Sequence, residues 1–220
     1  MTPARLRPTA PIAADAVLVG DPGRALALAQ ELLEAPKMSN HARGLWGYSG
    51  RTPAGRELTV QSTGMGGPSA ALVLGDLAEL GVRRAVRVGT CTSLRPELAP
   101  GDLLLVEEAH AWAGPGGGAG EEIAPDLELT AALRGRLGGG CRSGSVASLE
   151  TLHREHPDPA ALRADAADMQ TAALLGRGRA LGVALAAVLV VSEGVDGQPL
   201  DDEGLERSAK LAGSAAAAVL

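Results

Sequence analysis

Aromatic side chains are nearly absent from this 220-residue chain, which contains one Tyr, two Trp and no Phe. The core must therefore be built from Leu, Val and Ala, packed between elements that approach each other at small side chains. The same scarcity limits aromatic stacking. A flat, ring-shaped ligand would have to lie against aliphatic or Met side chains.

Cysteine, basic charge and long apolar runs are also scarce. Cys91 and Cys141 are the only two cysteines and lack CxxC spacing, which predicts free thiols in a reducing, cytoplasmic compartment. A net charge of −6 argues against broad nucleic-acid binding but permits a local arginine cluster that holds a small anion. No apolar run reaches the roughly eighteen residues of a membrane span, and residues 1–10 do not read as a signal peptide. We therefore expect neither membrane insertion nor secretion.

The residues that are present alternate between short apolar runs and helical patterns. This alternation predicts one α/β layered domain over residues 1–220. The apolar run 183–191 is typical of a strand buried on both faces, and the glycine-rich stretches 114–120 and 138–140 are typical of loops. The expected strands are 16–19, 57–61, 84–88, 103–106, 143–147 and 183–191, and the expected helices are 24–33, 68–80, 162–181 and 203–220.

Glycine-rich turns follow three of the expected strands, at Gly20, Gly64 and Gly89. In an open α/β sheet, ligands bind in the crevice outside the carboxyl ends of the strands. Glycine lets backbone N–H groups approach an anion closely. These turns therefore indicate one anion site at the edge of the sheet.

Three arginines lie beside these turns or between them: Arg24, Arg43 and Arg87. A guanidinium fork suits the tetrahedral oxygens of phosphate, and Thr90 adds a hydroxyl donor. Taken singly, each arginine is more often a solvated surface charge. Taken together, they favour phosphate as the anion.

The order of these segments resembles the nucleoside phosphorylase family that includes bacterial purine nucleoside phosphorylases and uridine phosphorylases. The sequences GDPGR at 20–24, RGLWGY at 43–48 and RVGT at 87–90 are similar to the three phosphate elements of that family, and TGMGGPS at 63–69 adds specificity. The resemblance, from about residue 15 to 192, implies a three-layer αβα fold with a central mixed sheet. It also implies assembly as dimers, often three of them in a hexamer.

The implied reaction is reversible phosphorolysis, in which phosphate attacks the anomeric carbon as the N-glycosidic bond breaks, giving a free base and a pentose 1-phosphate. Phosphate is then a co-substrate, and neither an organic cofactor nor a metal is implied. The residues that match the family's phosphate site are Gly20, Arg24, Arg43, Arg87 and Thr90, with Arg43 lent across a subunit interface. Related nucleosidases use water and lack this arginine set, so the resemblance favours phosphorolysis.

The family holds the sugar with a Glu-Met-Glu motif at the start of a helix, which here reads Asp168-Met169-Gln170. Met169 is expected to lie against the sugar, and Met65 to contact the nucleoside. Gln170 replaces a charged acceptor by a neutral amide that can still accept a hydrogen bond. Because charge-assisted hydrogen bonds are the stronger kind, we expect weaker binding of the sugar hydroxyls.

The family's purine-specific members place an Asp where this chain has Glu193. Glu193 is therefore the candidate general acid to the purine ring, with its carboxyl displaced by about 1.5 Å through the extra methylene. Arg207 resembles the arginine that assists this acid in a closed state. Thr92 replaces a Gly beside the base and should narrow the base pocket. The Gln and Arg pair by which uridine phosphorylases read uracil has no counterpart, so purine is favoured.

Other departures leave alternatives open. The family's N-terminal His is missing, and Leu149 or Leu152 stands where an aromatic near the sugar is expected. His153 and His156 have HxxH spacing, a weak signal for a metal site, and a loop is the favoured interpretation of this segment. The chain is then either a working phosphorylase with altered sugar contacts or an impaired relative that binds phosphate or nucleoside, or serves in assembly. A uridine phosphorylase is a further alternative.

Overall fold

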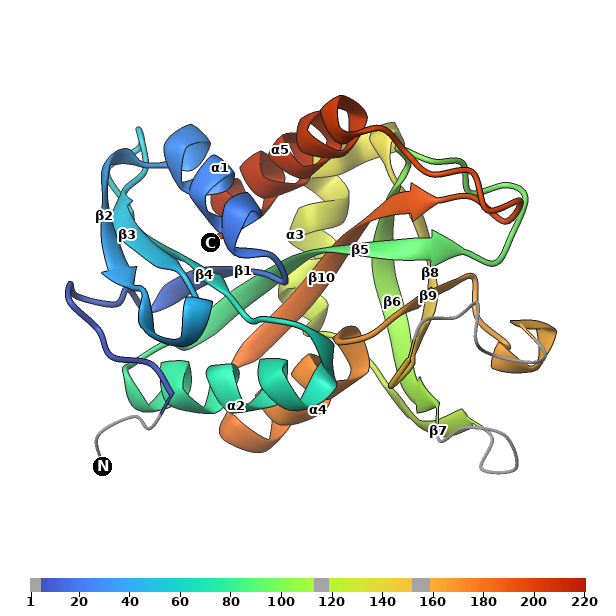
Figure 1. Ribbon diagram of the computed structural model, residues 1–220, viewed down its shortest axis with the longest axis horizontal. Helices are drawn as coiled ribbons and strands as arrows, with labels where there is room; N and C mark the ends of the chain where they lie inside the picture. Colours follow the sequence, from blue (N-terminus) through green and yellow to red (C-terminus); the bar gives the residue numbers. More distant parts are fainter. Residues whose placement is uncertain (1–4, 113–118, 152–158) are drawn as a thin grey trace.

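The computed structural model describes residues 5–112, 119–151 and 159–220, whose ten strands form one mixed sheet with helices on both faces (Figure 1). The strands are β1 (Asp15–Val19), β2 (Glu34–Asn40), β3 (Gly47–Arg51), β4 (Glu57–Ser62), β5 (Arg84–Ser93), β6 (Leu103–Trp112), β7 (Ala119–Ile123), β8 (Arg142–Ser148), β9 (Ala166–Asp168) and β10 (Ala184–Glu193). The helices are α1 (Pro22–Leu32), α2 (Gly66–Glu79), α3 (Leu127–Leu137), α4 (Thr171–Leu181) and α5 (Asp202–Val219). Short 3-10 turns occur at Ala42–Gly44, Gly138–Gly140 and Pro159–Leu162.

Four parallel strands at the centre of the sheet direct their carboxyl ends to the same edge. β1 pairs with β4 on one side and β5 on the other, and β5 pairs in parallel with β10. The interior residues of β10 are buried, as expected for the apolar run 183–191. Because the backbone of each strand is held on both sides, this edge is a firm platform for the residues that follow each strand.

The sheet also closes on itself beyond β5. The strand order β10-β6-β8-β9-β5 is completed by the β10–β5 pairing, so five strands form a ring. β9 is only three residues long, yet it joins β8 in parallel and β5 in antiparallel register. This short strand places Asp168 at the point where the ring meets the central sheet.

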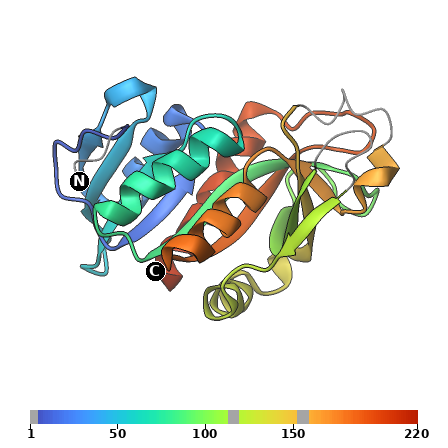
Figure 2. The same cartoon turned by 90° about the horizontal axis from the view of Figure 1, so that it is seen from below.

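Helices cover the sheet in two layers, with α1, α3 and α5 on one face and α2 and α4 on the other (Figures 1 and 2). Two clusters of Leu, Val and Ala fill the space between the sheet and these layers. Leu28 of α1 and Ala216 of α5 belong to the first layer's cluster, and Leu74 of α2 and Leu174 of α4 to the second's. The three-layer αβα fold and its aliphatic core are as the sequence predicts.

The expected helix 162–181 is wrong in its first half. Residues Ala166–Asp168 form β9, and α4 begins only at Thr171. Backbone pairing of this segment with Thr92 and Ser93 outweighs the high helix propensity of its alanines. β2, β3, β7 and α3 were not expected from the sequence pattern, whereas all six expected strands are present.

The cysteines, the apolar helices and the glycine-rich stretches were also the subject of expectations from the sequence. Cys91 and Cys141 are both free thiols, as predicted. No helix within the described ranges combines the length and apolar character needed to cross a membrane. The glycine stretch 138–140 forms a 3-10 turn after α3, whereas most of 114–120 falls outside the described residues.

Candidate active site

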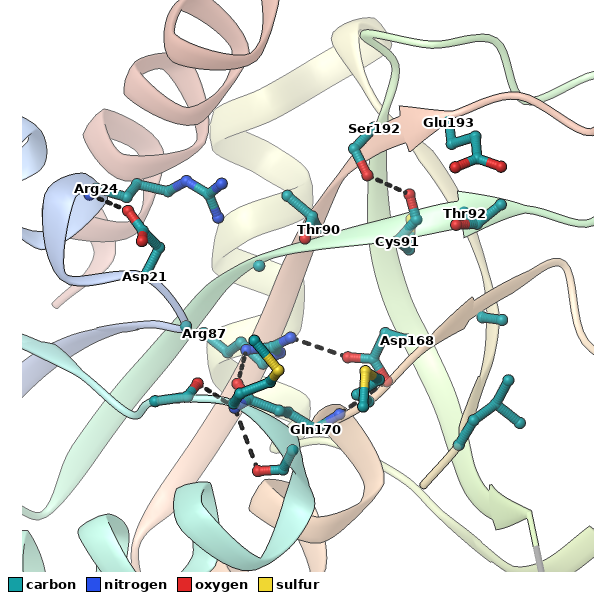
Figure 3. Close-up of a pocket in the computed structure, with 18 of the residues that line it drawn as sticks. Asp21, Arg24, Arg87, Thr90, Cys91, Thr92, Asp168, Gln170, Ser192 and Glu193 are labelled. Atoms are coloured by element: carbon teal, nitrogen blue, oxygen red, sulfur yellow. Dashed lines mark hydrogen bonds and ion pairs between the residues drawn. The ribbon is translucent and has the colours of Figure 1, made fainter. Parts of the chain in front are cut away.

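A cavity of about 530 Å³ opens at the carboxyl ends of β1, β5 and β10, in the crevice that the sequence predicts (Figure 3). The turn before α2, the segment from β9 to α4 and the residues that follow β8 supply the remaining walls. Ten of the twelve predicted site residues line it: Gly20, Arg24, Met65, Arg87, Thr90, Thr92, Asp168, Met169, Gln170 and Glu193. The cavity therefore collects residues from distant parts of the chain.

Arg24 lies in the first turn of α1 and directs its guanidinium toward the cavity (Figure 3). Asp21 caps this helix by accepting a 2.7 Å hydrogen bond from the Arg24 backbone N–H, and Pro22 occupies the first helical position. Burial lowers the pKa of the guanidinium, an effect that Asp21 partly offsets and the charge of Arg87 adds to. Its N–H groups donate to no acceptor within the described residues. Arg24 is a partly buried cation at a helix N-terminus, open to an anion.

Arg87, by contrast, is held by protein on three sides. Its guanidinium is 4% exposed and pairs with Asp168 at 2.9 Å. Nε donates to Thr171 Oγ1 at 3.0 Å, and Nη1 donates to Gln170 Oε1 at 2.7 Å. Arginine has five N–H donors, so two remain after these three bonds. Gly89 is required beneath this side chain, because a Cβ there would lie 2.6 Å from Arg87 Cζ.

Asp168 is the counter-charge of Arg87 and the hub of this network. One carboxylate oxygen accepts from Arg87 and from Thr171, and the other accepts from Ser148 Oγ at 2.5 Å and from the Gln170 backbone N–H. Burial of the pair is supported by this complete set of donors. Both oxygens of Asp168 are thus occupied by protein.

Gln170 lies beside Asp168 at the start of α4 and is 4% exposed. Its Oε1 accepts from Arg87 and from Thr63 Oγ1 at 3.1 Å. Its Nε2 donates to the carbonyl oxygens of Gly64 at 2.6 Å and Gly66 at 3.3 Å. The amide therefore joins β5, α4 and the turn before α2.

Two thioethers and two hydroxyls complete the lining. Met65 is 82% exposed at the N-cap of α2, and Met169 is partly buried next to Asp168. Thr90 and Thr92 follow Gly89 on β5, and both are partly exposed in the cavity wall. This portion of the wall offers apolar contact and hydroxyl groups without a net charge.

Glu193 ends β10 at the opposite rim (Figure 3). The β10–β5 register shifts between Val191 and Glu193, and Glu193 then stands opposite Thr92. Ser192 donates from Oγ to the Cys91 carbonyl at 3.1 Å, which ties the irregular strand end to β5. This bulge places the carboxylate of Glu193 at the rim of the cavity, next to Thr92, which the sequence predicts to contact the base.

Arg43 and Arg207 do not line the cavity. Arg43 lies exposed in the 3-10 turn Ala42–Gly44 with φ 58°. Arg207 lies on α5 with its side chain 69% exposed and pairs with Glu203 at 3.1 Å. In this single chain neither side chain joins the other site residues in the cavity lining. Their assigned roles, across an interface and in a closed state, stay predictions.

Sequence reasoning missed several lining residues, among them Asp21, Cys91 and Ser192. Asp21 carried a recognisable signal, because Asp followed by Pro is a common start of a helix. Burial raises the pKa of the Cys91 thiol, and the negative charge of Asp168 adds to this, so the thiol stays protonated. Leu149 does line the cavity, whereas Leu152, His153 and His156 fall outside the described residues.

Comparison with known proteins gives one consistent family. The model of the phosphorylase superfamily matches residues 15–220. The chain is 30% identical over 194 residues to the DeoD-type purine nucleoside phosphorylase of Caldanaerobacter subterraneus subsp. tengcongensis, covering 83% of each chain. It is 32% identical over 196 residues to the enzyme of the same name from Clostridium novyi, covering 84% of each.

Solved structures share the fold at lower identity. The purine nucleoside phosphorylase of Toxoplasma gondii, in complex with immucillin-H, superposes with a TM-score of 0.80 at 23% identity, covering 94% of this chain and 89% of that one. The uridine phosphorylase of Vibrio fischeri gives 0.79 at 20% identity, covering 95% and 92%. The family match over most of the chain, the relatives and the cavity agree, and the chain therefore belongs to the phosphorylase superfamily.

Proposed function

We propose that this protein catalyses the phosphorolysis of a purine nucleoside to a free base and a pentose 1-phosphate. The observation that carries the proposal is Arg24, a partly buried guanidinium in the cavity wall that donates to no acceptor in the described parts of the chain. Desolvating a cation without an anion is costly, so the position favours an anionic ligand. Phosphate meets this requirement.

Phosphate would occupy the floor of the cavity at the carboxyl ends of β1 and β5. Arg24 and the two remaining donors of Arg87 supply positive charge, and Thr90 supplies a hydroxyl. The backbone at Gly20 and the N-terminus of α1 favour negative charge as well. Fixing phosphate below the sugar aligns it for attack on the anomeric carbon.

The nucleoside would lie above phosphate, with the sugar against Met65 and Met169 and the base toward Thr92. As the N-glycosidic bond breaks, electrons move to the base and the sugar gains oxocarbenium character. Glu193, which lines the cavity opposite Thr92, would protonate the departing purine. The phosphate oxygen then forms the new bond to the anomeric carbon.

The DeoD-type relatives favour purine as the base, which agrees with the absence of a uracil-reading Gln and Arg pair from the sequence. The likeness to a uridine phosphorylase lies at an identity where only the fold is shared. We therefore expect purine nucleosides to be the substrates, and uridine serves as the negative control in the assay below.

We also infer that the protein works as a homo-oligomer, a dimer or a hexamer built of dimers. Arg43 supports this, because it stands exposed with a left-handed backbone, which is uncommon for a non-glycine residue and points to a constrained role. In such an assembly Arg43 would complete the phosphate site of the neighbouring subunit. Size-exclusion chromatography with light scattering of the wild type and Arg43→Ala measures the oligomer, and phosphate affinity measures the contribution of Arg43.

A second candidate function is phosphate or nucleoside binding without efficient turnover. It is favoured by Gln170, whose amide is occupied by protein, and by Glu193, which replaces the family's Asp. Release of free base from inosine, adenosine, guanosine and uridine, measured with and without phosphate, separates the two. We expect phosphate-dependent release from at least one purine nucleoside and little from uridine. Phosphate binding without any release would support the second function instead.

A further inference from the structure

The structure assigns Gln170 a positioning role: its neutral amide holds Arg87 and the turn at residues 64–66 in place, instead of accepting hydrogen bonds from the sugar hydroxyls. This inference rests on the proposed function and deepens it. It concerns how this chain prepares its phosphate site after exchanging the family's glutamate for an amide.

The hydrogen bonds of the Gln170 amide support this positioning role. A primary amide offers two N–H donors and a carbonyl oxygen with two lone pairs. Nε2 uses its donors on Gly64 O and Gly66 O, and Oε1 accepts from Arg87 and Thr63. Protein uses both donors and one lone pair, and the other lone pair faces Thr63 Oγ1, whose single proton is shared with the carbonyl oxygen of Val19 at 2.9 Å. The side chain is 4% exposed. A sugar hydroxyl would have to displace an existing partner.

The donors of the amide have no equivalent in a carboxylate. The turn that they hold is unusual, because Gly64 has φ 73° and Gly66 has φ 78°, both in the left-handed region. Its two carbonyl oxygens face Nε2 of Gln170. An ionised Glu in the same rotamer would set an oxygen against these carbonyls. The neutral amide therefore fixes the turn that carries Met65 into the cavity.

The carbonyl oxygen of the amide acts on Arg87. Together with Asp168 and Thr171 it takes three of the five guanidinium donors, so Arg87 cannot swing and presents its two remaining donors from a fixed position. A pre-positioned donor loses less entropy when a ligand binds. Gln170 should therefore affect phosphate affinity rather than recognition of the sugar.

Two substitutions test the inference. Gln170→Met removes every hydrogen bond at similar volume, and Gln170→Glu keeps an acceptor for Arg87 but loses the donors. Phosphate titration calorimetry gives Kd, and kcat/KM is measured for inosine and 2′-deoxyinosine. We expect both variants to weaken phosphate binding about tenfold, the size of one lost buried hydrogen bond. We expect the inosine to 2′-deoxyinosine ratio of kcat/KM to stay within about twofold of the wild type, because the sugar loses no partner.

The matched control is Gln61→Glu, on β4 outside the cavity. Gln61 is also fully buried and donates from Nε2 to backbone carbonyls, those of Leu45 and Ser62. The same chemical change there is expected to leave phosphate Kd unchanged. If the control weakens phosphate binding as much as the Gln170 variants do, the effect is general loosening and the inference is overturned.

A sugar-binding role gives the opposite pattern. Unchanged phosphate Kd in both variants, or a Gln170→Glu enzyme whose preference for inosine over 2′-deoxyinosine rises about tenfold, overturns the inference, since a charged acceptor gains that much on a hydroxyl. Thermal melts identify any variant that does not fold. If Gln170→Glu does not fold, the phosphate Kd of Gln170→Met tests the inference. Failure of the proposed function is a separate result, because wild-type protein would then release no base with phosphate while Kd still reports on Gln170.

Discussion

The two arginines of the cavity differ in how the protein treats their charge. Arg24 is partly buried and donates to no acceptor within the described segments, whereas Arg87 is almost fully buried and held by Asp168, Gln170 and Thr171. One guanidinium is left open for a ligand, and the other is fixed by its surroundings. Arginine therefore offers unused donors to a ligand at Arg24, whereas at Arg87 its donors join elements of the protein and fix the side chain.

The contrast extends to the two sides of the cavity. The side of β1 and α1 has open donors around a helix N-terminus, while the side of β9 and α4 has a network around Asp168 that uses three of the five donors of Arg87. Open donors are expected to control ligand affinity, and the closed network is expected to control stability and geometry. Mutations at the open side should therefore weaken phosphate binding at little cost in stability. Mutations at the closed side should lower stability and, by releasing Arg87, weaken phosphate binding to a smaller extent.

The largest expected effect is on stability, at the closed side. Asp168→Asn removes the counter-charge of Arg87 from a buried site, which should lower the free energy of unfolding by about 3–5 kcal/mol. Urea denaturation measures it. The control is Glu107→Gln, which breaks an exposed pair with Arg134 and should cost under about 1 kcal/mol. Equal losses in the two variants would contradict the contrast between the sides.

At the open side, Arg24→Met should weaken phosphate binding by a hundredfold or more, about 3 kcal/mol, because two charge-assisted hydrogen bonds are lost. Stability without phosphate should stay the same or rise, since a desolvated cation is removed. Phosphate titration and thermal melts give the two values. Arg51→Met, on β3 away from the cavity, is the control and should leave phosphate binding intact. A stable Arg24→Met protein that binds phosphate normally would remove Arg24 from the site.

Substitution of Glu193 tests protonation of the departing base separately from phosphate binding. Glu193→Gln keeps the shape of the side chain but cannot deliver a proton in the same way, so kcat with inosine should fall about a hundredfold. Phosphate affinity should be unchanged, because Glu193 stands at the opposite rim. A variant with wild-type kcat would show that the base leaves without help from this carboxyl.

The smallest expected effect is at Arg207. Its side chain is exposed and its partner Glu203 lies one helical turn away, a pairing that contributes about 0.5 kcal/mol or less. Arg207→Ala should therefore change kcat by less than about twofold. It should change the free energy of unfolding by less than about 0.5 kcal/mol. A tenfold fall in kcat would instead support the closed-state role that the sequence predicts, and would require α5 to move toward Glu193.

Much of the open side could be predicted from sequence because its signals are local. Gly20 and Arg24 follow β1 within a few residues, and Thr90 lies near the carboxyl end of β5, so strand ends alone bring them together. The α/β layering and all six expected strands followed from apolar and alternating patterns in the same way, and the three-layer fold followed from the resemblance to a family. Here, short-range pattern and resemblance to a family pointed to the same place.

The closed side could not be predicted in this way. Several of its bonds join residues 81 to 107 positions apart, such as Arg87 with Asp168 and Thr63 with Gln170. Whether Gln170 faces a sugar or the protein depends on that packing. The same long-range pairing turned part of the expected helix 162–181 into β9. Arg207 failed to reach the cavity for a related reason, since its place on α5 is set by the helix and not by the motif.

The most direct test of the account is a crystal structure with phosphate and a purine nucleoside bound. We predict phosphate within hydrogen-bond distance of the Arg24 guanidinium and the Thr90 hydroxyl, bound also by Arg87, with Gln170 still bonded to the carbonyls of Gly64 and Gly66. Phosphate found away from Arg24, or a Gln170 amide turned to the sugar hydroxyls, would contradict the division between an open and a closed side.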